Sequence, residues 1–224
     1  MGVAMRIDQL RVRNFKGFED REVSLHPEFN LVVGVNGSGK TTVLDALAIA
    51  AAGWLLGIPG ADGRPIRPDE VRLVGFDHGD QRRWEPQYPC SVIATGVIDG
   101  SSLSWSRELE RPRGRTTSAR ARGIRDAATR AAKAVAGGEP VVLPLVSYYG
   151  TGRLWNTPRD QEQVTGDQDL LEGRPSRLDG YRSSVDPRVS SKDLVRWFAR
   201  QSWVSFQRNG RSSVRLIPRR GGSC

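Results

Sequence analysis

Cysteine is nearly absent from this sequence, since only Cys90 and Cys224 occur among its 224 residues. Two cysteines are too few for a disulfide framework, so a reducing, cytoplasmic setting is the default expectation. Long hydrophobic runs are also missing. No apolar stretch approaches the ~20 residues that cross a bilayer, and no apolar segment follows Arg6 as a signal peptide would require. The sequence therefore predicts no association with a membrane.

The sequence also contains few hydrophobic residues and few lysines. Hydrophobic residues make up 38% of the chain, which is low for a compact domain of this size, so we expect long exposed segments or missing partner surface. Lysine is scarce, with only four among 34 basic residues, although the net charge is +9. A GC-rich genome produces the same arginine bias, so we do not interpret it as function. The length suits one domain or one and a half.

The clearest pattern runs from Phe29 to Leu55, FNLVVGVNGSGKTTVLDALAIAAAGWL. Residues 31–33 form a short apolar run, typical of a strand buried on both faces of a parallel sheet. From Thr42 the apolar residues recur at helical spacing, and Gly53 is a plausible helix stop. Between them lies Gly34-x-x-x-x-Gly39-Lys40-Thr41, the phosphate-binding P-loop or Walker A pattern. The alternative is a glycine-rich turn that binds nothing.

The residue types suit a nucleotide phosphate. Glycines let backbone N–H groups turn toward an anion, and the N-terminus of the following helix adds partial positive charge. Lys40 can reach the β- and γ-phosphates, Thr41 can offer its hydroxyl oxygen to Mg²⁺, and Thr42 can donate to the α-phosphate. The sequence therefore predicts ATP and Mg²⁺ as cofactors, with Thr41 as the metal ligand. The predicted nucleotide-binding residues are Gly34, Asn36, Gly37, Ser38, Gly39, Lys40, Thr41 and Thr42.

The other segments predict an α/β fold with an antiparallel part. Alternating residues predict strands over 6–15 and 21–25, joined by a turn at 16–18. An Asp99-Gly100 turn predicts a second hairpin over 90–109, with Trp105 as a packing residue. We expect loops over 57–69 and 156–187, a helix over 121–138 that ends at Gly137-Gly138, a core strand over 141–149, and a helix over 190–204 capped by Ser190.

The stretch LRVRNFKGFEDREVSL, followed by NLVVGVNGSGKTTVLDALA, resembles the opening of the RecF/SMC-type AAA ATPases, an ABC-like group. The likeness rests on the turn at 14–18, on the Asn in the P-loop and on the spacing between them. It is strong over residues 5–55 and weaker elsewhere. LPLVSYYGTGRLW and KDLVRWFARQSW are similar to later segments of one subfamily, which includes predicted ATP-binding proteins of Septu-like phage-defence systems.

This resemblance implies an α/β P-loop NTPase lobe with a mixed sheet, an antiparallel β subdomain and flanking helices. We expect that lobe over residues 1–150 and the start of a truncated helical lobe over 151–224. In this family two ATPase heads sandwich two ATP molecules, and the sandwich drives work on DNA or on a bound nuclease. The partners implied are therefore a second head in a homodimer of complete heads, DNA and a nuclease.

Four further residues acquire roles from the resemblance. It places Arg13, Asn14 and Lys16 near the nucleotide, although a solvated hairpin tip explains the same residues. Arg153 lies where ABC-type heads carry a loop that senses the γ-phosphate, with Gln161 and Gln163 as weaker candidates. The alternative for Arg153 is a structural arginine in a turn.

The motifs that this family needs for hydrolysis are missing after Tyr149. An apolar strand ending in Asp-Glu would hold Mg²⁺ and polarise the attacking water, and a Ser-Gly-type signature would serve the partner's ATP. Asp99 is explained by its Asp-Gly turn, and no Glu follows Asp77, so we do not expect either to bind metal. We expect an incomplete domain, cut off near Arg219, that binds ATP but does not hydrolyse it efficiently.

A basic segment favours a competing function. Between Arg107 and Lys133 there are nine basic residues against three acidic ones, a composition that could follow the phosphates of DNA. The competing hypothesis is a basic nucleic-acid-binding module with a vestigial P-loop. Aromatic residues are not interleaved with the arginines, so base stacking is not indicated. For the helix, a solvated face is the simpler interpretation, whereas for the loop over 111–122 a solvated loop and a phosphate-binding loop both stay open.

Overall fold

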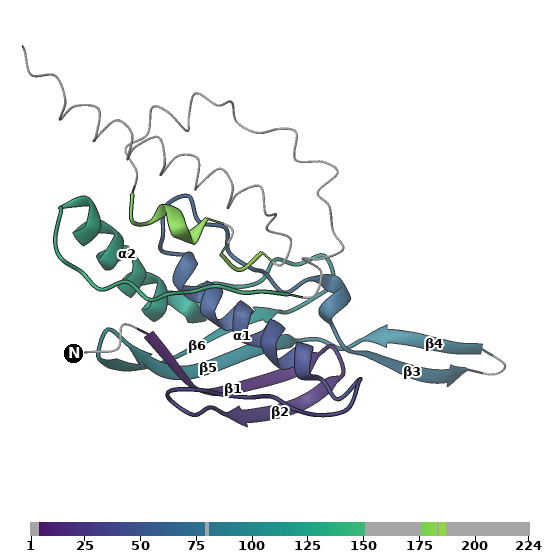
Figure 1. The fold of residues 1–224 in the computed structure, drawn as a ribbon. Coiled ribbons are helices and arrows are strands. Elements are labelled where there is room, and N and C mark those ends of the chain that lie inside the picture. Colours follow the sequence, from purple (N-terminus) through teal and green to yellow (C-terminus); the bar gives the residue numbers. More distant parts are fainter. Residues whose placement is uncertain (1–4, 79–80, 151–175, 183, 187–224) are drawn as a thin grey trace, which may run out of the picture.

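The computed structural model describes residues 5–78, 81–150, 176–182 and 184–186. Its centre is a four-stranded antiparallel sheet in the order β2-β1-β5-β6. Helices α1 and α2 pack on one face of this sheet (Figure 1). The elements are β1 (Met5–Phe15), β2 (Phe18–Ser24), α1 (Lys40–Leu55), β3 (Leu73–His78), β4 (Gln81–Pro86), β5 (Cys90–Ile98), β6 (Ser101–Leu109) and α2 (Arg122–Ala136).

The alternation of residues along β1 decides which face of the sheet is buried. Leu10 and Val12 are buried in the core, whereas Arg11 and Arg13 lie on the opposite, solvent-exposed face. On that face Arg11 is paired with Asp20 of β2 through a contact of 2.7 Å. One polar and one apolar face is the usual pattern of an antiparallel sheet that is covered on one side only.

Both predicted hairpins are confirmed. They could be predicted because the residues of each turn specify its conformation. Lys16 and Gly17 form the turn between β1 and β2, and Asp99 and Gly100 form the turn between β5 and β6. Asp99 and Gly100 have φ angles of 50° and 75°, as a two-residue type I′ turn requires. Trp105 packs in the core as predicted, and its indole N–H donates to the Ala50 carbonyl at 2.9 Å.

Helix α1 is confirmed, but the predicted stop at Gly53 is wrong. The helix continues through Gly53 to Leu55. At Gly53 the helix lies close to β6 and α2, since an added Cβ would be 3.3 Å from Trp105 and 3.2 Å from Ile124. Gly53 therefore permits close packing and does not end the helix.

Helix α2 and its glycine stop are confirmed. Its apolar face buries Ile124, Ala128 and Ala132. After Ala136, the N–H of Gly137 donates to the Lys133 carbonyl at 2.9 Å, and Gly138 takes a φ of 77°. A glycine with positive φ just past the last turn is a common helix ending.

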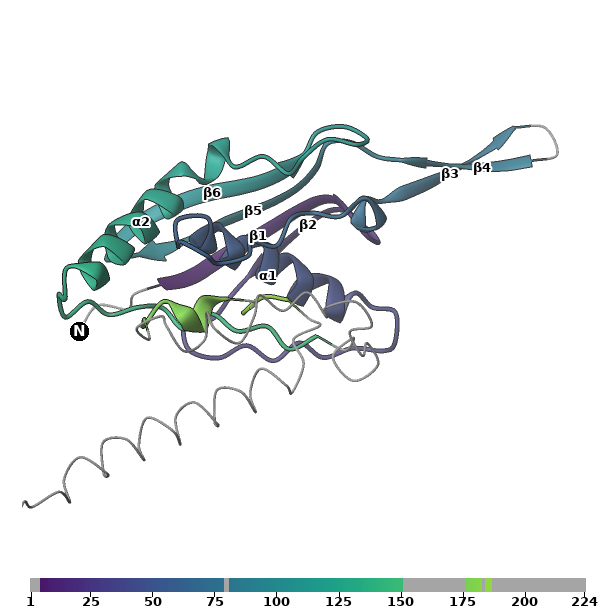
Figure 2. The same ribbon diagram turned by 90° about the horizontal axis from the view of Figure 1, so that it is seen from above.

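The strand predicted over 31–33 in a parallel sheet and the core strand predicted over 141–149 are both wrong for the residues described. Residues 31–33 and 141–149 are not assigned to any strand, and Val33 and Leu145 are 77% and 96% exposed. A parallel strand needs a neighbouring strand to share its hydrogen bonds, and no strand of the described residues is paired with either segment. Helix α1 lies between these two segments and the four-stranded sheet (Figure 2), so the apolar sides of both segments that face away from α1 are open to solvent.

Strands β3 and β4 form a two-stranded antiparallel ribbon, for which the sequence analysis predicted no strands. They pair only with each other, and the ribbon projects from the body (Figures 1 and 2). Trp84 lies opposite Gly75, and the Arg82 guanidinium is 5.0 Å from the centre of its ring.

Residues 176–186 add a short segment to the same core. Tyr181 and Val185 are buried, and the Tyr181 hydroxyl donates to the Pro144 carbonyl at 2.5 Å. The helix predicted over 190–204 lies outside the described residues. Within the described part of the chain, no helix is long and apolar enough to cross a membrane.

Candidate functional site

The P-loop joins the extended segment 29–35 to the first turn of α1. Gly37 and Gly39 have φ angles of 82° and 89°, in the left-handed region that favours glycine. Gly39 precedes the first residue of the helix, and the Val43 N–H donates to its carbonyl at 3.0 Å. No acidic residue lies in the first turn of α1, so no carboxylate there competes with an anion at the helix N-terminus.

Lys40 is directed back onto the loop. Its ammonium donates to the carbonyl oxygens of Gly34 and Val35, both at 2.8 Å. These bonds place the positive charge on the side of the helix N-terminus, where phosphate oxygens would replace the carbonyl oxygens as acceptors. Asn36, Gly37, Ser38 and Thr41 are exposed, and Thr42 is half-buried. The loop is therefore accessible to a ligand.

The remaining chemistry of the loop fits a nucleotide with Mg²⁺. Thr41 would supply a hydroxyl oxygen to the ion, and Mg²⁺ retains most of its water ligands in such sites. The ion would supply positive charge that offsets the charge of the phosphates. Within the described ranges, no group of three or more His, Cys, Asp or Glu side chains could hold a metal ion, so the P-loop site depends on the nucleotide for its other ligands.

The tip of the β1–β2 hairpin lies beside the P-loop. A Cβ added to Gly39 would come within 2.4 Å of the Phe18 ring, so Phe18 packs directly against the loop. Arg13 is exposed and lies 3.2 Å from Asp20, and the Asn14 amide donates to the Pro89 carbonyl at 3.1 Å. The geometry brings this hairpin to the predicted site, and the nucleotide contacts of Arg13 and Asn14 stay predictions.

Lys16 belongs to a buried group of charges, which we call the Asp45 cluster: Lys16, Asp45, Arg64, Glu70 and Tyr148. The Lys16 ammonium donates to Asp45 Oδ2, and Arg64 Nη2 and the Tyr148 hydroxyl donate to Oδ1 at 2.8 and 2.6 Å. Arg64 also donates to Glu70 at 2.9 Å. Two basic and two acidic side chains thus compensate each other's charge, as buried ions require.

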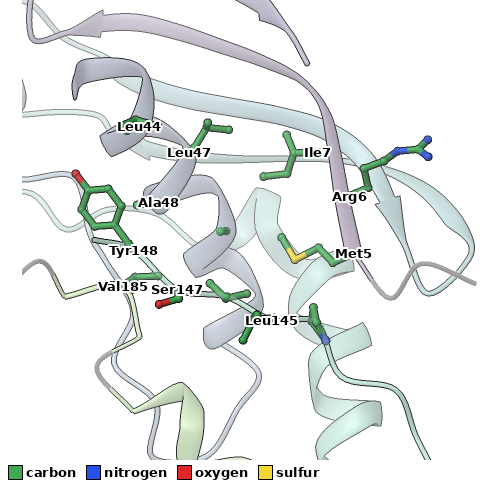
Figure 3. A pocket seen from close by; sticks show the side chains of 13 residues that line it. Met5, Arg6, Ile7, Leu44, Leu47, Ala48, Leu145, Ser147, Tyr148 and Val185 are labelled. Atoms are coloured by element: carbon green, nitrogen blue, oxygen red, sulfur yellow. The ribbon is translucent and has the colours of Figure 1, made fainter. Parts of the chain in front are cut away.

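Tyr148 attaches the segment 141–149 to the P-loop helix through this cluster. Its ring lies 5.6 Å from the Arg64 guanidinium, and burial together with the hydrogen bond to Asp45 raises the pKa of its hydroxyl. Figure 3 shows Tyr148 beside α1, with its hydroxyl end nearer to Leu44 than to the later turns. The apolar groove drawn there lies between α1, the start of β1 and residues 144–148, and contains no P-loop residue.

Sequence reasoning missed most of the Asp45 cluster. Tyr148 lies 103 residues from Asp45 and Arg64 lies 19 residues away, so no local pattern links them. One signal was present. Asp45 follows Thr41 by four residues on a predicted helix, which places both on the same face.

Several other predicted residues lie away from the loop or outside the described chain. Arg153, Gln161 and Gln163 lie outside the described residues. Asp77 lies on the projecting ribbon, is exposed and is 3.9 Å from Arg82.

The basic segment 107–133 is not uniformly available to phosphates. Arg107 is buried on β6, where its Nε donates to the Thr117 carbonyl at 3.2 Å and burial lowers its pKa. Arg120 is paired with Glu108 at 2.8 Å. Arg113, Arg115 and Arg122 are exposed.

Comparison with known proteins agrees with this geometry. A family model described as an AAA domain matches residues 9–197, which is most of the chain. The chain belongs to the AAA domain family. Its P-loop, its α1 and its hairpin tip all lie within the matched residues. The mixed α/β architecture, with antiparallel sheets and few helices, is compatible with the P-loop ATPase lobe that the sequence predicted.

Individual relatives of this AAA domain point to the RecF/SMC type. Proteins named DNA replication and repair protein RecF match with 43% identity over 49 residues in Chlamydia caviae, 42% over 65 in Edwardsiella ictaluri and 44% over 80 in Cronobacter sakazakii. These matches cover 22%, 29% and 35% of the chain. The chain spans only 13%, 18% and 22% of the length of these relatives.

Proposed function

We propose that this AAA domain binds ATP with Mg²⁺ through residues 34–42 and forms the nucleotide-binding lobe of a RecF/SMC-type ATPase. One observation carries the proposal. Two glycines with positive φ lead into the N-terminus of α1, with Lys40 directed onto the loop. The partial positive charge of the helix N-terminus and the Lys40 ammonium on the same loop together favour a polyphosphate. The residues that would hold it are Gly34, Asn36, Gly37, Ser38, Gly39, Lys40, Thr41 and Thr42, with Arg13, Asn14 and Lys16 nearby.

The setting of this activity is also a proposal. We infer DNA-linked work in the cytoplasm, with repair favoured over phage defence because the relatives named above are replication and repair proteins. A dimer of complete heads would supply the second nucleotide face, and DNA or a nuclease would be the further partner. We keep the domain division predicted from the sequence, with the nucleotide-binding lobe over residues 1–150 and the start of a helical lobe over residues 151–224.

Replacing Lys40 tests the proposal. The Lys40→Ala variant should bind ATP at least tenfold more weakly, since a hydrogen bond to a charged group contributes about 1.5–3 kcal/mol. Lys133→Ala, which removes an exposed lysine from α2, is the matched control and should bind ATP like the wild type. Isothermal titration calorimetry with Mg²⁺ present measures both. Equal affinity of the Lys40→Ala variant and the wild type would contradict the proposal.

The chain should hydrolyse ATP only negligibly by itself, because the Asp-Glu strand and the signature motif are missing from its sequence. Release of inorganic phosphate under saturating ATP and Mg²⁺ measures this. A turnover near the ~1 s⁻¹ typical of slow enzymes, abolished in Lys40→Ala, would show that a catalytic acid had been overlooked.

A further inference from the structure

Asp45 presents a problem for an anion-binding loop. Its side chain is only 8% exposed. It lies four residues after Thr41 on α1, so it shares a helix face with the predicted Mg²⁺ ligand. An uncompensated carboxylate at this position would repel the phosphates that the helix N-terminus attracts. Whatever neutralises Asp45 therefore affects the charge at the P-loop.

The negative charges of the Asp45 and Glu70 carboxylates are balanced only when Lys16 is included. Arg64, which is 5% exposed, is shared between Asp45 and Glu70. One guanidinium cannot neutralise two carboxylates. The Lys16 ammonium contacts Asp45 directly and lies 3.7 Å from Glu70, so it supplies the second positive charge. Tyr148 adds a hydrogen bond to Asp45 but no charge.

We propose that Lys16 is a positioning residue that acts on the nucleotide through Asp45 and does not contact the phosphates itself. It neutralises the Asp45 carboxylate and so fixes the hairpin tip to α1, while Phe18 of the same hairpin packs separately against Gly39 of the P-loop. Its backbone supports the same position, since its N–H donates to the Glu70 carbonyl at 2.6 Å. The inference rests on the proposed function, because it concerns ATP affinity.

A double-mutant cycle separates this role from direct contact. Lys16→Gln leaves the cluster with one net negative charge and should weaken binding of ATP with Mg²⁺ by about tenfold at low salt, an effect of a unit charge at short range in an intermediate dielectric. Adding Asp45→Asn removes that charge and should restore affinity to within about twofold of the wild type. If Lys16 also contacted phosphate, the double variant would recover only the part of the loss that the Asp45 charge causes, and would still bind ATP severalfold more weakly than the wild type.

Two controls make the result specific. Arg11→Gln removes a basic residue of the same strand that is paired with Asp20 on the solvent face, and it should leave ATP affinity unchanged. Lys16→Arg keeps the charge and should bind ATP like the wild type even if it lowers the unfolding temperature. This variant still tests the proposal if Asp45→Asn prevents folding. If the Lys16 ammonium contacted a phosphate directly, replacing it by the larger, planar guanidinium of arginine should weaken ATP binding.

The experiment uses the full chain, with affinity measured by calorimetry in 25 mM and 500 mM NaCl. The loss in Lys16→Gln should shrink at the higher salt, because screening shortens the range of the extra charge. The proposal is overturned if Lys16→Gln binds normally, if Asp45→Asn fails to rescue it, or if Lys16→Arg is as weak as Lys16→Gln. Failure of the wild type to bind ATP would overturn the proposed function as well.

Discussion

The two glycines with positive φ in the P-loop are required for different reasons. Gly37 has a φ of 82° and nothing lies within 4 Å of an added Cβ, so only backbone strain opposes a side chain there. Gly39 has a φ of 89°, and an added Cβ would also come within 2.4 Å of the Phe18 ring. Gly39 thus serves both the loop conformation and the close packing of the hairpin tip.

This difference predicts unequal losses of stability. Gly37→Ala should lower the free energy of unfolding by about 1 kcal/mol, the cost of a left-handed residue with a Cβ. Gly39→Ala should lower it by about 1–3 kcal/mol more, because the methyl group also overpacks against Phe18. Urea unfolding followed by circular dichroism measures both. Adding Phe18→Ala should recover the larger part of the Gly39→Ala penalty, whereas strictly additive losses would show that Phe18 is not the obstacle.

At the scale of elements, the extended segments 29–35 and 141–149 differ from the strands of the antiparallel sheet. Their valines and leucines would suit a buried strand, yet Val33 and Val35 are 77% and 79% exposed. Val92 on β5 is 1% exposed. The same residue type therefore contributes little to stability in one place and much in the other, because apolar area stabilises only when it leaves water.

Replacing valine by serine at each position tests this contrast. Val33→Ser should change the free energy of unfolding by less than about 0.5 kcal/mol, as exposed positions usually do. Val92→Ser should cost about 2–4 kcal/mol, because it opens a cavity and buries a hydroxyl. Thermal unfolding of both variants is the measurement. A large loss in Val33→Ser would mean that this segment is buried in solution, against another copy or another part of a sheet.

The same contrast explains which elements could be predicted from the sequence. The Asp99-Gly100 hairpin and the helix ending at Gly137-Gly138 are specified by residues within a few positions of each other, so local chemistry was sufficient. A strand over 31–33 depends on neighbours that its own residues do not specify. In the site, the P-loop was evident because it is contiguous, whereas the contact of Tyr148 with Asp45 spans 103 residues and gives no local signal.

At the scale of the whole molecule, a net charge of +9 does not identify a DNA-binding surface. Of the basic segment 107–133, Arg107 is buried and Arg120 is paired with Glu108. The buried Arg107 cannot neutralise a DNA phosphate, and Arg120 would first have to leave Glu108. The segment therefore offers fewer phosphate contacts than its composition suggests, and Arg113, Arg115 and Arg122 are three of its exposed arginines that can be tested together.

If this segment contacts duplex DNA, replacing Arg113, Arg115 and Arg122 together by Ser should reduce the salt dependence of binding by up to about three units, since each neutralised phosphate releases about 0.9 counterion. Arg21, Arg82 and Arg83 are also exposed but lie on β2 and the ribbon, so replacing them by Ser removes the same charge elsewhere and is the matched control. Fluorescence anisotropy across a salt titration gives the slopes. Equal slopes for the two triple variants would assign DNA binding to overall charge, because a specific surface must lose more when its own arginines are removed.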